Sequence, residues 1–329
     1  MSTNADGKNA LLVISPSAST GSDRTLVFEL AERLRGRVLP ELGSHAGRRA
    51  QGDGAGGDVT FAVDAIAEAE LSSFLAERAP RMAYYSEDRG LVAAPEATHV
   101  LVVDPIDGTR PAMAGLESAC VAVALAPLGD GEPTMGDLQL GCVVEIKSGD
   151  WFLAERGSGV EATRPVKLSA ASEVRRMFWG YGFRGRPVRA TAEVLADLID
   201  ASSVGGGTFE LGSQAFAMTR IVTGQFDAVI EVGSRLIDDV PEMRAEFERV
   251  GGGQVLNNSP YDLAAPWLCL IEAGGIVTDG WGAQLHARRL LGSGHDFQMS
   301  SISAANSTLH AELLQAIDNG IDRLRRLHS

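Results

Sequence analysis

The strongest chemical signal in this sequence is one run of six residues, Asp104-Pro105-Ile106-Asp107-Gly108-Thr109. It follows an apolar run, residues 100–103, that predicts a strand ending at Asp104. A Pro-Ile turn would direct Asp104 and Asp107 into one pocket, where two carboxylates repel each other unless a hard cation binds both. Gly108 permits close backbone approach, and Thr109 would begin a helix whose free N–H groups face an oxyanion. The alternative is an ordinary turn whose carboxylates bond to the backbone.

Three further acidic segments supply candidate residues. They are Ser86-Glu87-Asp88 after a strand-like run, Asp58-Val59-Thr60 followed by Asp64 at the head of a helix, and Tyr261-Asp262-Leu263-Ala264-Ala265 at the start of another helix. Each segment alone has a structural explanation. A loop acid is usually solvated, an Asp or Thr before a helix is an N-cap, and an acid in the first turn interacts favourably with the helix dipole.

Taken together and in this order, the four segments resemble the inositol monophosphatase family. That family belongs to a lithium-sensitive group with the fructose-1,6-bisphosphatases and the 3′(2′),5′-bisphosphate nucleotidases. The matching patterns are an Asp-x-Val-Thr-x-x-Asp-like segment, a Gly-Glu-Glu loop, Asp-Pro-Ile-Asp-Gly-Thr and Trp-Asp-x-Ala-Ala. The resemblance implies an α+β fold, a layered α-β-α-β-α sandwich. It also implies a Mg²⁺-dependent phosphatase that hydrolyses a small phosphate monoester.

The resemblance assigns metal ligands residue by residue. Glu87 would bind the first ion and touch a third, and Asp104 would bridge the first two. The backbone carbonyl of Ile106 would complete the first site, and Asp107 and Asp262 would hold the second. Oxygen ligands alone favour Mg²⁺, with Mn²⁺ as a substitute, over zinc. The resemblance thus implies two or three Mg²⁺ ions.

The resemblance also implies catalytic and substrate-binding roles. Glu87 would be catalytic through its metal ions. Asp64 and Thr109 would hydrogen-bond and activate the attacking water, and the backbone N–H groups of Gly108 and Thr109 would cradle the phosphate. Arg110 could meet a second phosphate or a carboxylate of the substrate, and its alternative is a surface salt bridge.

The sequence departs from the family pattern in several places. The loop is Ser-Glu-Asp rather than Gly-Glu-Glu, which leaves a metal contact by Asp88 open, and Asp64 falls one residue later than the pattern. Tyr261 replaces the usual Trp, and arginines, Arg48 and Arg49, stand near the expected upstream Lys. The largest departure is the segment Gly233–Pro260, which borders the region where the family recognises its alcohol group. We therefore expect a substrate other than plain inositol monophosphate.

The composition and the hydrophobic pattern predict the elements that position these residues. The 329 residues are 45% hydrophobic and 22% charged, which suffices for a full core. The pattern predicts an α+β half over 1–175 that carries most metal ligands and an α/β half over 176–329 that carries Asp262. Helices are expected over 25–35, 61–78, 188–201, 213–222, 263–273 and 306–327, an antiparallel meander over 100–154, strands over 226–231 and 275–278, and an edge strand over 10–14.

The charge, the cysteines and the hydropathy limit which partners and which compartment the sequence favours. A net charge of −14 argues against binding of a nucleic-acid backbone. The three dispersed cysteines favour a reducing compartment, and no apolar run reaches the length of a membrane span. These observations predict a cytoplasmic protein with no nucleic-acid or membrane partner, and the resemblance adds a homodimer.

Other functions remain open from sequence. Within the same chemistry, a fructose-1,6-bisphosphatase or a 3′(2′),5′-bisphosphate nucleotidase is the alternative, although few aromatic residues, 6%, are present to stack on a base. A binding protein that keeps the fold without turnover is suggested by the altered Ser-Glu-Asp loop. A calcium loop is disfavoured because the EF-hand spacing does not continue after Asp107.

Overall fold

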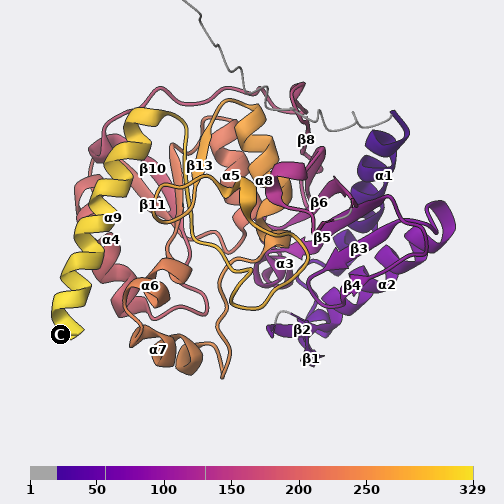
Figure 1. Ribbon diagram of the computed structural model, residues 1–329, viewed down its shortest axis with the longest axis horizontal. Helices are drawn as coiled ribbons and strands as arrows, with labels where there is room; N and C mark the ends of the chain where they lie inside the picture. Colours follow the sequence, from indigo (N-terminus) through magenta and orange to yellow (C-terminus); the bar gives the residue numbers. More distant parts are fainter. Residues whose placement is uncertain (1–20, 56, 130, 329) are drawn as a thin grey trace, which may run out of the picture.

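The computed structural model describes residues 21–55, 57–129 and 131–328. The edge strand expected over 10–14 lies outside these residues. Within them the chain forms two large sheets and a small hairpin (Figure 1). No helix of the described residues is both long and apolar enough to cross a membrane.

The first sheet is built wholly from residues 83–162 and contains the predicted meander. Its seven strands run in the order β4-β3-β5-β6-β7-β8-β9, and all neighbours are antiparallel except β3 and β5. The strands are β3 (Ala83–Ser86), β4 (Gly90–Val92), β5 (His99–Asp107), β6 (Cys120–Pro127), β7 (Leu140–Glu145), β8 (Trp151–Glu155) and β9 (Gly159–Ala162).

The second sheet is built from residues 178–304 and is mixed. Its order is β11-β10-β12-β14-β13, with β10 parallel to both neighbours and β14 antiparallel to both of its own. The strands are β10 (Phe178–Tyr181), β11 (Gly207–Phe209), β12 (Ala228–Glu231), β13 (Ile276–Thr278) and β14 (Ser301–Ala304). The proposed division at residues 175 and 176 therefore falls between the two sheets.

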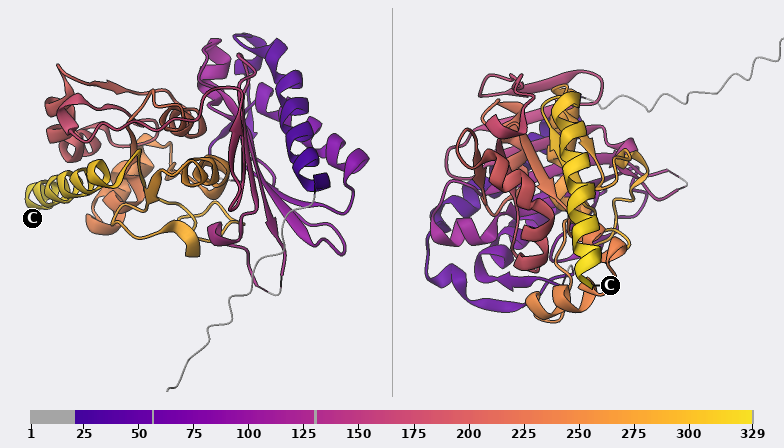
Figure 2. Two further views of the ribbon diagram at one scale, coloured as in Figure 1. Left: turned by 90° about the horizontal axis from the view of Figure 1, so that it is seen from above. Right: turned by 90° about the vertical axis from the view of Figure 1, so that its left-hand side faces the viewer.

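Helices form three layers around these sheets, as Figure 2 shows from above. One pair covers the outer face of the first sheet, one pair fills the space between the sheets, and one pair covers the outer face of the second. These pairs are α1 (Gly21–Val38) and α2 (Ala62–Arg78), α5 (Gln214–Val222) and α8 (Pro260–Glu272), and α4 (Val188–Ser202) and α9 (Ser307–His328). The α+β fold with α-β-α-β-α layers is thus confirmed.

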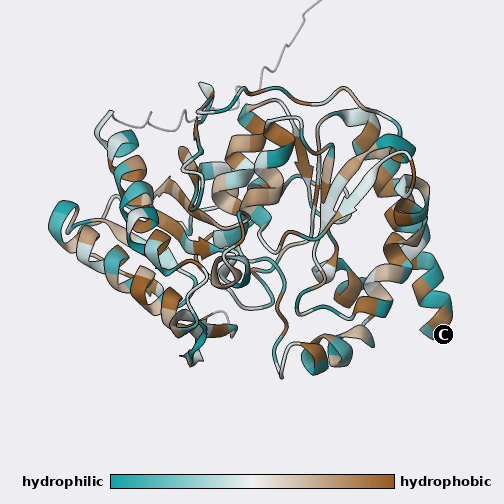
Figure 3. Cartoon of the chain, turned by 180° about the vertical axis from the view of Figure 1, so that it is seen from behind, coloured by the Kyte–Doolittle hydropathy of each residue, from teal (hydrophilic) through white to brown (hydrophobic). Residues whose placement is uncertain are grey.

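Alternation along the strands produces these layers. Successive strand side chains point to opposite faces. In β5, Val100 and Val102 belong to the core between the sheets, whereas Leu101 and Val103 belong to the core under α1 and α2. The third core lies between the second sheet and its outer helices. Figure 3 shows the result on the flanking helices, which carry hydrophobic and hydrophilic residues side by side.

Several parts of the fold were not expected from the sequence, among them three strands of the second sheet, β10, β11 and β14. The strands β1 (Ala50–Asp53) and β2 (Val59–Phe61) form an antiparallel hairpin that the sequence pattern did not predict. The segment Gly233–Pro260 contains two short helices, α6 (Gly233–Asp239) and α7 (Met243–Val250). A further short helix, α3 (Thr109–Ala114), begins at Thr109 as expected.

Candidate active site

A β-bulge brings two carboxylates to one face of the first sheet. Strand β5 does not end at Asp104 in a Pro-Ile turn, as the sequence suggested, but continues to Asp107. Asp104 pairs with Ala122 and Asp107 with Cys120, so β5 has one extra residue here. In a regular strand, residues three apart point to opposite faces, and the extra residue restores them to the same face. Pro105 has no N–H to donate to the ladder, and it is tolerated here because a bulge interrupts the ladder.

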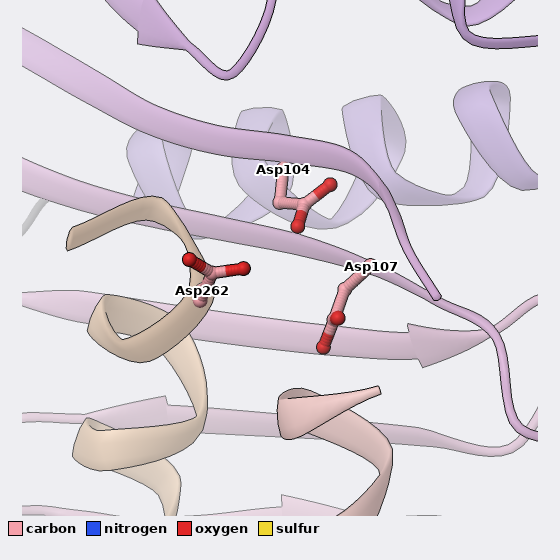
Figure 4. Close-up of side chains that lie close together, drawn as sticks. All are labelled: Asp104, Asp107 and Asp262. Atoms are coloured by element: carbon pink, nitrogen blue, oxygen red, sulfur yellow. The ribbon is translucent and has the colours of Figure 1, made fainter. Parts of the chain in front are cut away.

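The third carboxylate comes from the other half of the chain. Asp262 lies in the first turn of α8, which packs on the same face of the first sheet. One oxygen from each of Asp104, Asp107 and Asp262 lies within 4.8 Å of the others. Figure 4 shows the three carboxylates grouped between the strand and the helix start.

A backbone N–H fixes one oxygen of most of these acids. Ile106 N donates to Asp104 Oδ1 at 3.0 Å, and Ser259 N donates to Asp262 Oδ2 at 2.7 Å. These bonds orient each side chain and occupy one oxygen of each carboxylate.

Asp107 is also bound to the start of α5. Its carboxylate accepts hydrogen bonds from Ser213 Oγ at 2.9 Å, from Gln214 N at 3.3 Å and from Ala215 N. The free N–H groups and the dipole of a helix start favour a negative charge there. The sequence placed a helix over 213–222 but gave no sign that it would meet Asp107.

Burial raises the pKa values of the cluster, and the charges of neighbouring acids add to this effect at Asp104 and Asp262. Burial, partly offset by hydrogen bonds from α5, raises the pKa of Asp107 to about 6. Burial followed by the charge of Asp107 raises the pKa of Asp262 to about 7. Burial followed by Glu87 and Asp107 raises the pKa of Asp104 well above its usual range. The protein environment therefore disfavours these charges until a cation balances them.

The remaining predicted site residues lie around this cluster. Asp64 lies near the start of α2, where its Oδ2 accepts a bond from Phe61 N at 2.8 Å, and the Thr109 hydroxyl lies against it. Burial raises the pKa of Asp64 to about 7. Thr109 Oγ1 also donates to the Ile106 carbonyl at 3.2 Å. The predicted pair of Asp64 and Thr109 is thus in contact.

Glu87 lies at the end of β3 and is not one of the three acids that meet within 4.8 Å in the described chain. It lines the same cleft as Asp107 and Asp262. Burial followed by the charges of Asp262 and Asp64 raises its pKa well above the usual range. Its neighbour Asp88 accepts a hydrogen bond from the Thr60 hydroxyl instead of joining the cluster.

Gly108 lies where the chain leaves β5. Its φ is +91°, and a Cβ there would lie 2.6 Å from the Ser118 carbonyl oxygen. Both constraints require glycine, so the bulge and the start of α3 depend on this residue.

A second arginine, Arg184, joins Arg110 beside the site, and the sequence pattern did not predict it. Asp58 was expected to be an N-cap, but it bonds to Arg110 in two contacts of 3.2 Å and to Arg184 at 2.7 Å. Arg110 also lies over the Phe61 ring at 5.4 Å. Arg110 thus forms the salt bridge that was its alternative, while still lining the cleft. Arg184 and Asp58 join loops of the two halves, a contact that the separation of 126 residues hides in the sequence.

The donor set fits a hard divalent cation. Three carboxylates with raised pKa values converge here, and their potential ligand atoms are all oxygens. They are held by strand β5 and helix α8. Mg²⁺ favours such oxygen ligands. The three cysteines are free and buried, and none of them belongs to this group of converging ligand atoms in the described chain.

Comparison with known proteins agrees with this geometry. The model of the inositol monophosphatase family matches residues 23–322. A fructose-1,6-bisphosphatase/inositol-1-monophosphatase of Methanothermobacter thermautotrophicus is 25% identical over 89% of this chain and 95% of its own length. An inositol-1-monophosphatase of Caulobacter vibrioides is 25% identical over 88% of this chain and 99% of its own. The solved extragenic suppressor protein suhB of Bartonella henselae has a TM-score of 0.67 at 20% identity, covering 90% and 98% of the two chains.

The chain belongs to the inositol monophosphatase family. It is accordingly a phosphatase, a phosphoric monoester hydrolase that depends on divalent metal ions.

Proposed function

We propose that this chain hydrolyses the phosphate monoester of a sugar, an inositol or a related small metabolite, with Mg²⁺ as its metal. The observation that carries the proposal is the convergence of Asp104, Asp107 and Asp262 within 4.8 Å at the edge of a cleft. The relatives named for inositol monophosphate and fructose 1,6-bisphosphate support a small phosphorylated alcohol as the substrate class.

In this proposal the acids around the cleft would hold two or three ions. Asp104, Glu87 and the Ile106 carbonyl would supply ligands for one site, and Asp104, Asp107 and Asp262 would supply ligands for the other. Such ions would balance the charge of the phosphate and make a water more acidic. The oxygens left unbonded by the backbone provide the ligand positions.

Asp64 and Thr109 position the water that attacks phosphorus. The Thr109 hydroxyl is within reach of both the Ile106 carbonyl and Asp64. Once its O–H turns from the carbonyl to Asp64, it can accept a proton from the water while it donates its own to Asp64. The expected gain from such a positioned acid–base pair is roughly 10²–10⁴-fold in rate.

The backbone N–H groups of Gly108 and Thr109 bind the phosphate oxygens in this proposal, because the short helix α3 begins here. Arg110 lines the same region and would act on the substrate only after exchanging its contact with Asp58. A homodimer, a cytoplasmic location and the lack of nucleic-acid binding remain predictions from the sequence.

The first test is phosphate release from a panel of sugar, inositol and nucleotide phosphates, with Mg²⁺, with Mn²⁺ and with EDTA. We expect release that requires the metal. A nucleotide 3′-phosphate as the best substrate would contradict the proposed substrate class. A folded protein that binds Mg²⁺ and releases no phosphate from any ester would favour a binding protein that keeps the fold without turnover.

A further inference from the structure

One row of residues across the first sheet carries two acids. Asp107 on β5 pairs with Cys120 on β6, and Cys120 pairs in turn with Glu145 on β7. Residues directly opposite each other on paired strands lie on the same face of a sheet. Cys120 belongs to the core between the sheets, so Asp107 and Glu145 both face the layer that contains α5 and α8.

Helix α5 binds this row near both of its ends. At its start, two N–H groups and the Ser213 hydroxyl bind the Asp107 carboxylate. Near its end, Arg220 Nη2 donates to Glu145 Oε1. From Gln214 to Arg220 a helix rises about 9 Å, and two strand spacings measure about 9.5 Å. The helix, which contacts β5, β6 and β7, therefore crosses the three strands with one anchor on each outer strand.

The anchor at the end of α5 is a buried ion pair. The side chains of Arg220 and Glu145 are 5% and 4% exposed. The guanidinium lies 4.2 Å from the centroid of the Phe216 ring, one turn earlier on the same helix. Ser148 Oγ donates to the second oxygen, Glu145 Oε2, at 2.7 Å. These contacts hold both charged groups in one orientation.

Core stability alone does not explain this pair. The cost of removing two charges from water can cancel their attraction, so apolar side chains of similar volume would serve the core as well. Neither Glu145 nor Arg220 lines the cleft of the described chain. A buried pair does select a register, because only one position of α5 on the sheet brings the guanidinium to the carboxylate.

We propose that Glu145 and Arg220 are positioning residues for the metal site. The pair holds α5 at the place on the sheet where the Ser213 hydroxyl and the first N–H groups meet Asp107. The Asp107 carboxylate is thereby fixed in the direction that a metal ion needs. The effect on Mg²⁺ affinity needs no turnover, and only the effect on catalysis rests on the proposed function.

The sign of the effect separates positioning from a through-space charge effect. Loss of Arg220 makes the surroundings of the acids more negative, which by Coulomb attraction alone would tighten the binding of a cation. Loss of position should weaken binding instead, because groups that orient a metal ligand contribute to metal affinity.

The experiment compares Arg220→Met with the double variant Glu145→Leu/Arg220→Met. The single variant leaves a buried carboxylate without its arginine, whereas the double variant keeps the net charge of the chain and replaces the pair by apolar side chains. The matched control is Arg235→Met. It removes an arginine that is 6% exposed and whose partners, Asp239 and Asp318, lie on α6 and α9.

Three quantities are measured for each variant. Calorimetric titration with Mg²⁺ and with Mn²⁺, well below the melting temperature, gives the metal affinity. Thermal unfolding in EDTA gives the stability, and kcat/KM on the best ester of the panel gives the catalytic effect.

We expect Arg220→Met and the double variant each to bind Mg²⁺ roughly 10- to 100-fold more weakly than the wild type, with kcat/KM falling in parallel. The double variant should melt at a higher temperature than Arg220→Met, because it leaves no unpaired buried charge. Arg235→Met should melt at a lower temperature than the wild type and bind Mg²⁺ within about threefold of it, because its partners do not touch Asp107.

Metal affinity that follows stability would overturn the proposal. This outcome is a double variant that regains the wild-type Mg²⁺ affinity, to within about threefold, as it regains stability. Tighter Mg²⁺ binding by Arg220→Met would also overturn it. The double variant decides the matter if Arg220→Met does not fold.

Failure of the proposed function is distinguishable from failure of the positioning pair. If the wild-type chain binds Mg²⁺ but hydrolyses none of the esters, the phosphatase proposal fails and the titrations still decide whether the pair positions the site. If it binds Mn²⁺ but not Mg²⁺, the metal assignment fails and the same comparison is made with Mn²⁺. A wild-type chain that binds neither ion would overturn both proposals.

Discussion

Single carboxylates in this protein serve the fold and the site at once. Asp64 and Asp262 each accept a hydrogen bond from the backbone at the start of a helix, which is the structural explanation that the sequence offered. Each also reaches the acid cluster or its neighbour, Thr109. The two explanations were therefore not exclusive, because a carboxylate has two oxygens and the backbone occupies only one.

The first residue-scale prediction concerns Asp104→Asn. Loss of one charge at the centre of the cluster should lower phosphatase activity and the affinity for Mg²⁺, each by at least about 100-fold. The same change should raise the melting temperature of the metal-free protein at pH 8, because it relieves repulsion among buried acids. Kinetics, Mg²⁺ calorimetry and thermal unfolding in EDTA measure these effects.

The matched control for Asp104→Asn is Glu161→Gln on the exposed edge of the same sheet, whose side chain is 70% exposed. It should leave all three quantities nearly unchanged. An Asp104→Asn protein that binds Mg²⁺ as well as the wild type would remove Asp104 from the ligand set.

The second prediction separates Asp64 from the metal ligands. Asp64→Asn should lower kcat by roughly 10²–10⁴-fold, because a neutral amide cannot take the proton from Thr109. Its Mg²⁺ affinity should stay within about threefold of the wild type, since the metal ligands remain. A large loss of Mg²⁺ affinity together with activity would instead make Asp64 a metal ligand.

At the scale of elements, the bulge in β5 decides the geometry. Without the extra residue, Asp107 would face the core under α1 and α2 rather than the cleft. The bulge passes directly into Gly108, whose positive φ turns the chain into α3. Strand, bulge and helix start therefore form one unit that positions two carboxylates and the adjacent backbone N–H groups.

The element-scale prediction is that Gly108→Ala destabilises the protein. The positive φ and the contact of 2.6 Å with the Ser118 carbonyl oxygen should lower the free energy of unfolding by at least about 1–3 kcal/mol. Urea unfolding measures the change, and activity should fall with it. In Gly36→Ala, the new Cβ on α1 meets nothing within 4 Å, so this control should gain roughly 0.5–1 kcal/mol. A neutral Gly108→Ala would show that the turn tolerates a side chain.

At the scale of the whole molecule, the site exists only where the two sheets meet. The bulge belongs to the first sheet, whereas α5 and α8, which lie between the sheets, bring the donors to Asp107 and the third acid. Residues of both halves also share the central core, so the halves are layers of one packed body. Metal binding should therefore stabilise the whole chain, since the unfolded chain has no such site.

The whole-molecule prediction is a pH-dependent stability that metal reverses. The folded pKa values of Asp64 and Asp262 are about 7, and that of Asp107 is about 6, all above the ordinary value of about 4. The metal-free folded chain thus binds more protons than the unfolded chain in this range, so its free energy of unfolding falls as pH rises from about 4 through about 7. Above that range Mg²⁺ should restore the loss.

Thermal unfolding at pH 5.5 and pH 8, in EDTA and in Mg²⁺, measures this effect. We expect the melting temperature in EDTA to be lower at pH 8 and the gain from Mg²⁺ to be larger there. A metal-free protein that is more stable at pH 8 than at pH 5.5 would contradict the raised pKa values.

The sequence by itself predicted the two halves, the strand meander and most of the helices, and its resemblance to the inositol monophosphatase family implied the layer order and the candidate acids. The meander and the helices follow from local patterns, because the alternation of β5 to β8 and the periodicity of α4 and α9 depend on residues that are close in the sequence. It did not reveal α6 and α7, which are only seven and eight residues long, or β1, whose residues are all exposed. Such elements leave no strong periodic signal.

Only the tertiary structure decided which residues meet. Asp107 lies 107 residues from the helix start that binds it, and Asp58 lies 126 residues from Arg184. Glu231 at the end of β12 and Asn257 before α8 line one cleft, although α6 and α7 separate them in the sequence. Contacts of this kind depend on layer packing and on one extra residue in a strand, and neither is encoded in the spacing of the residues that they join.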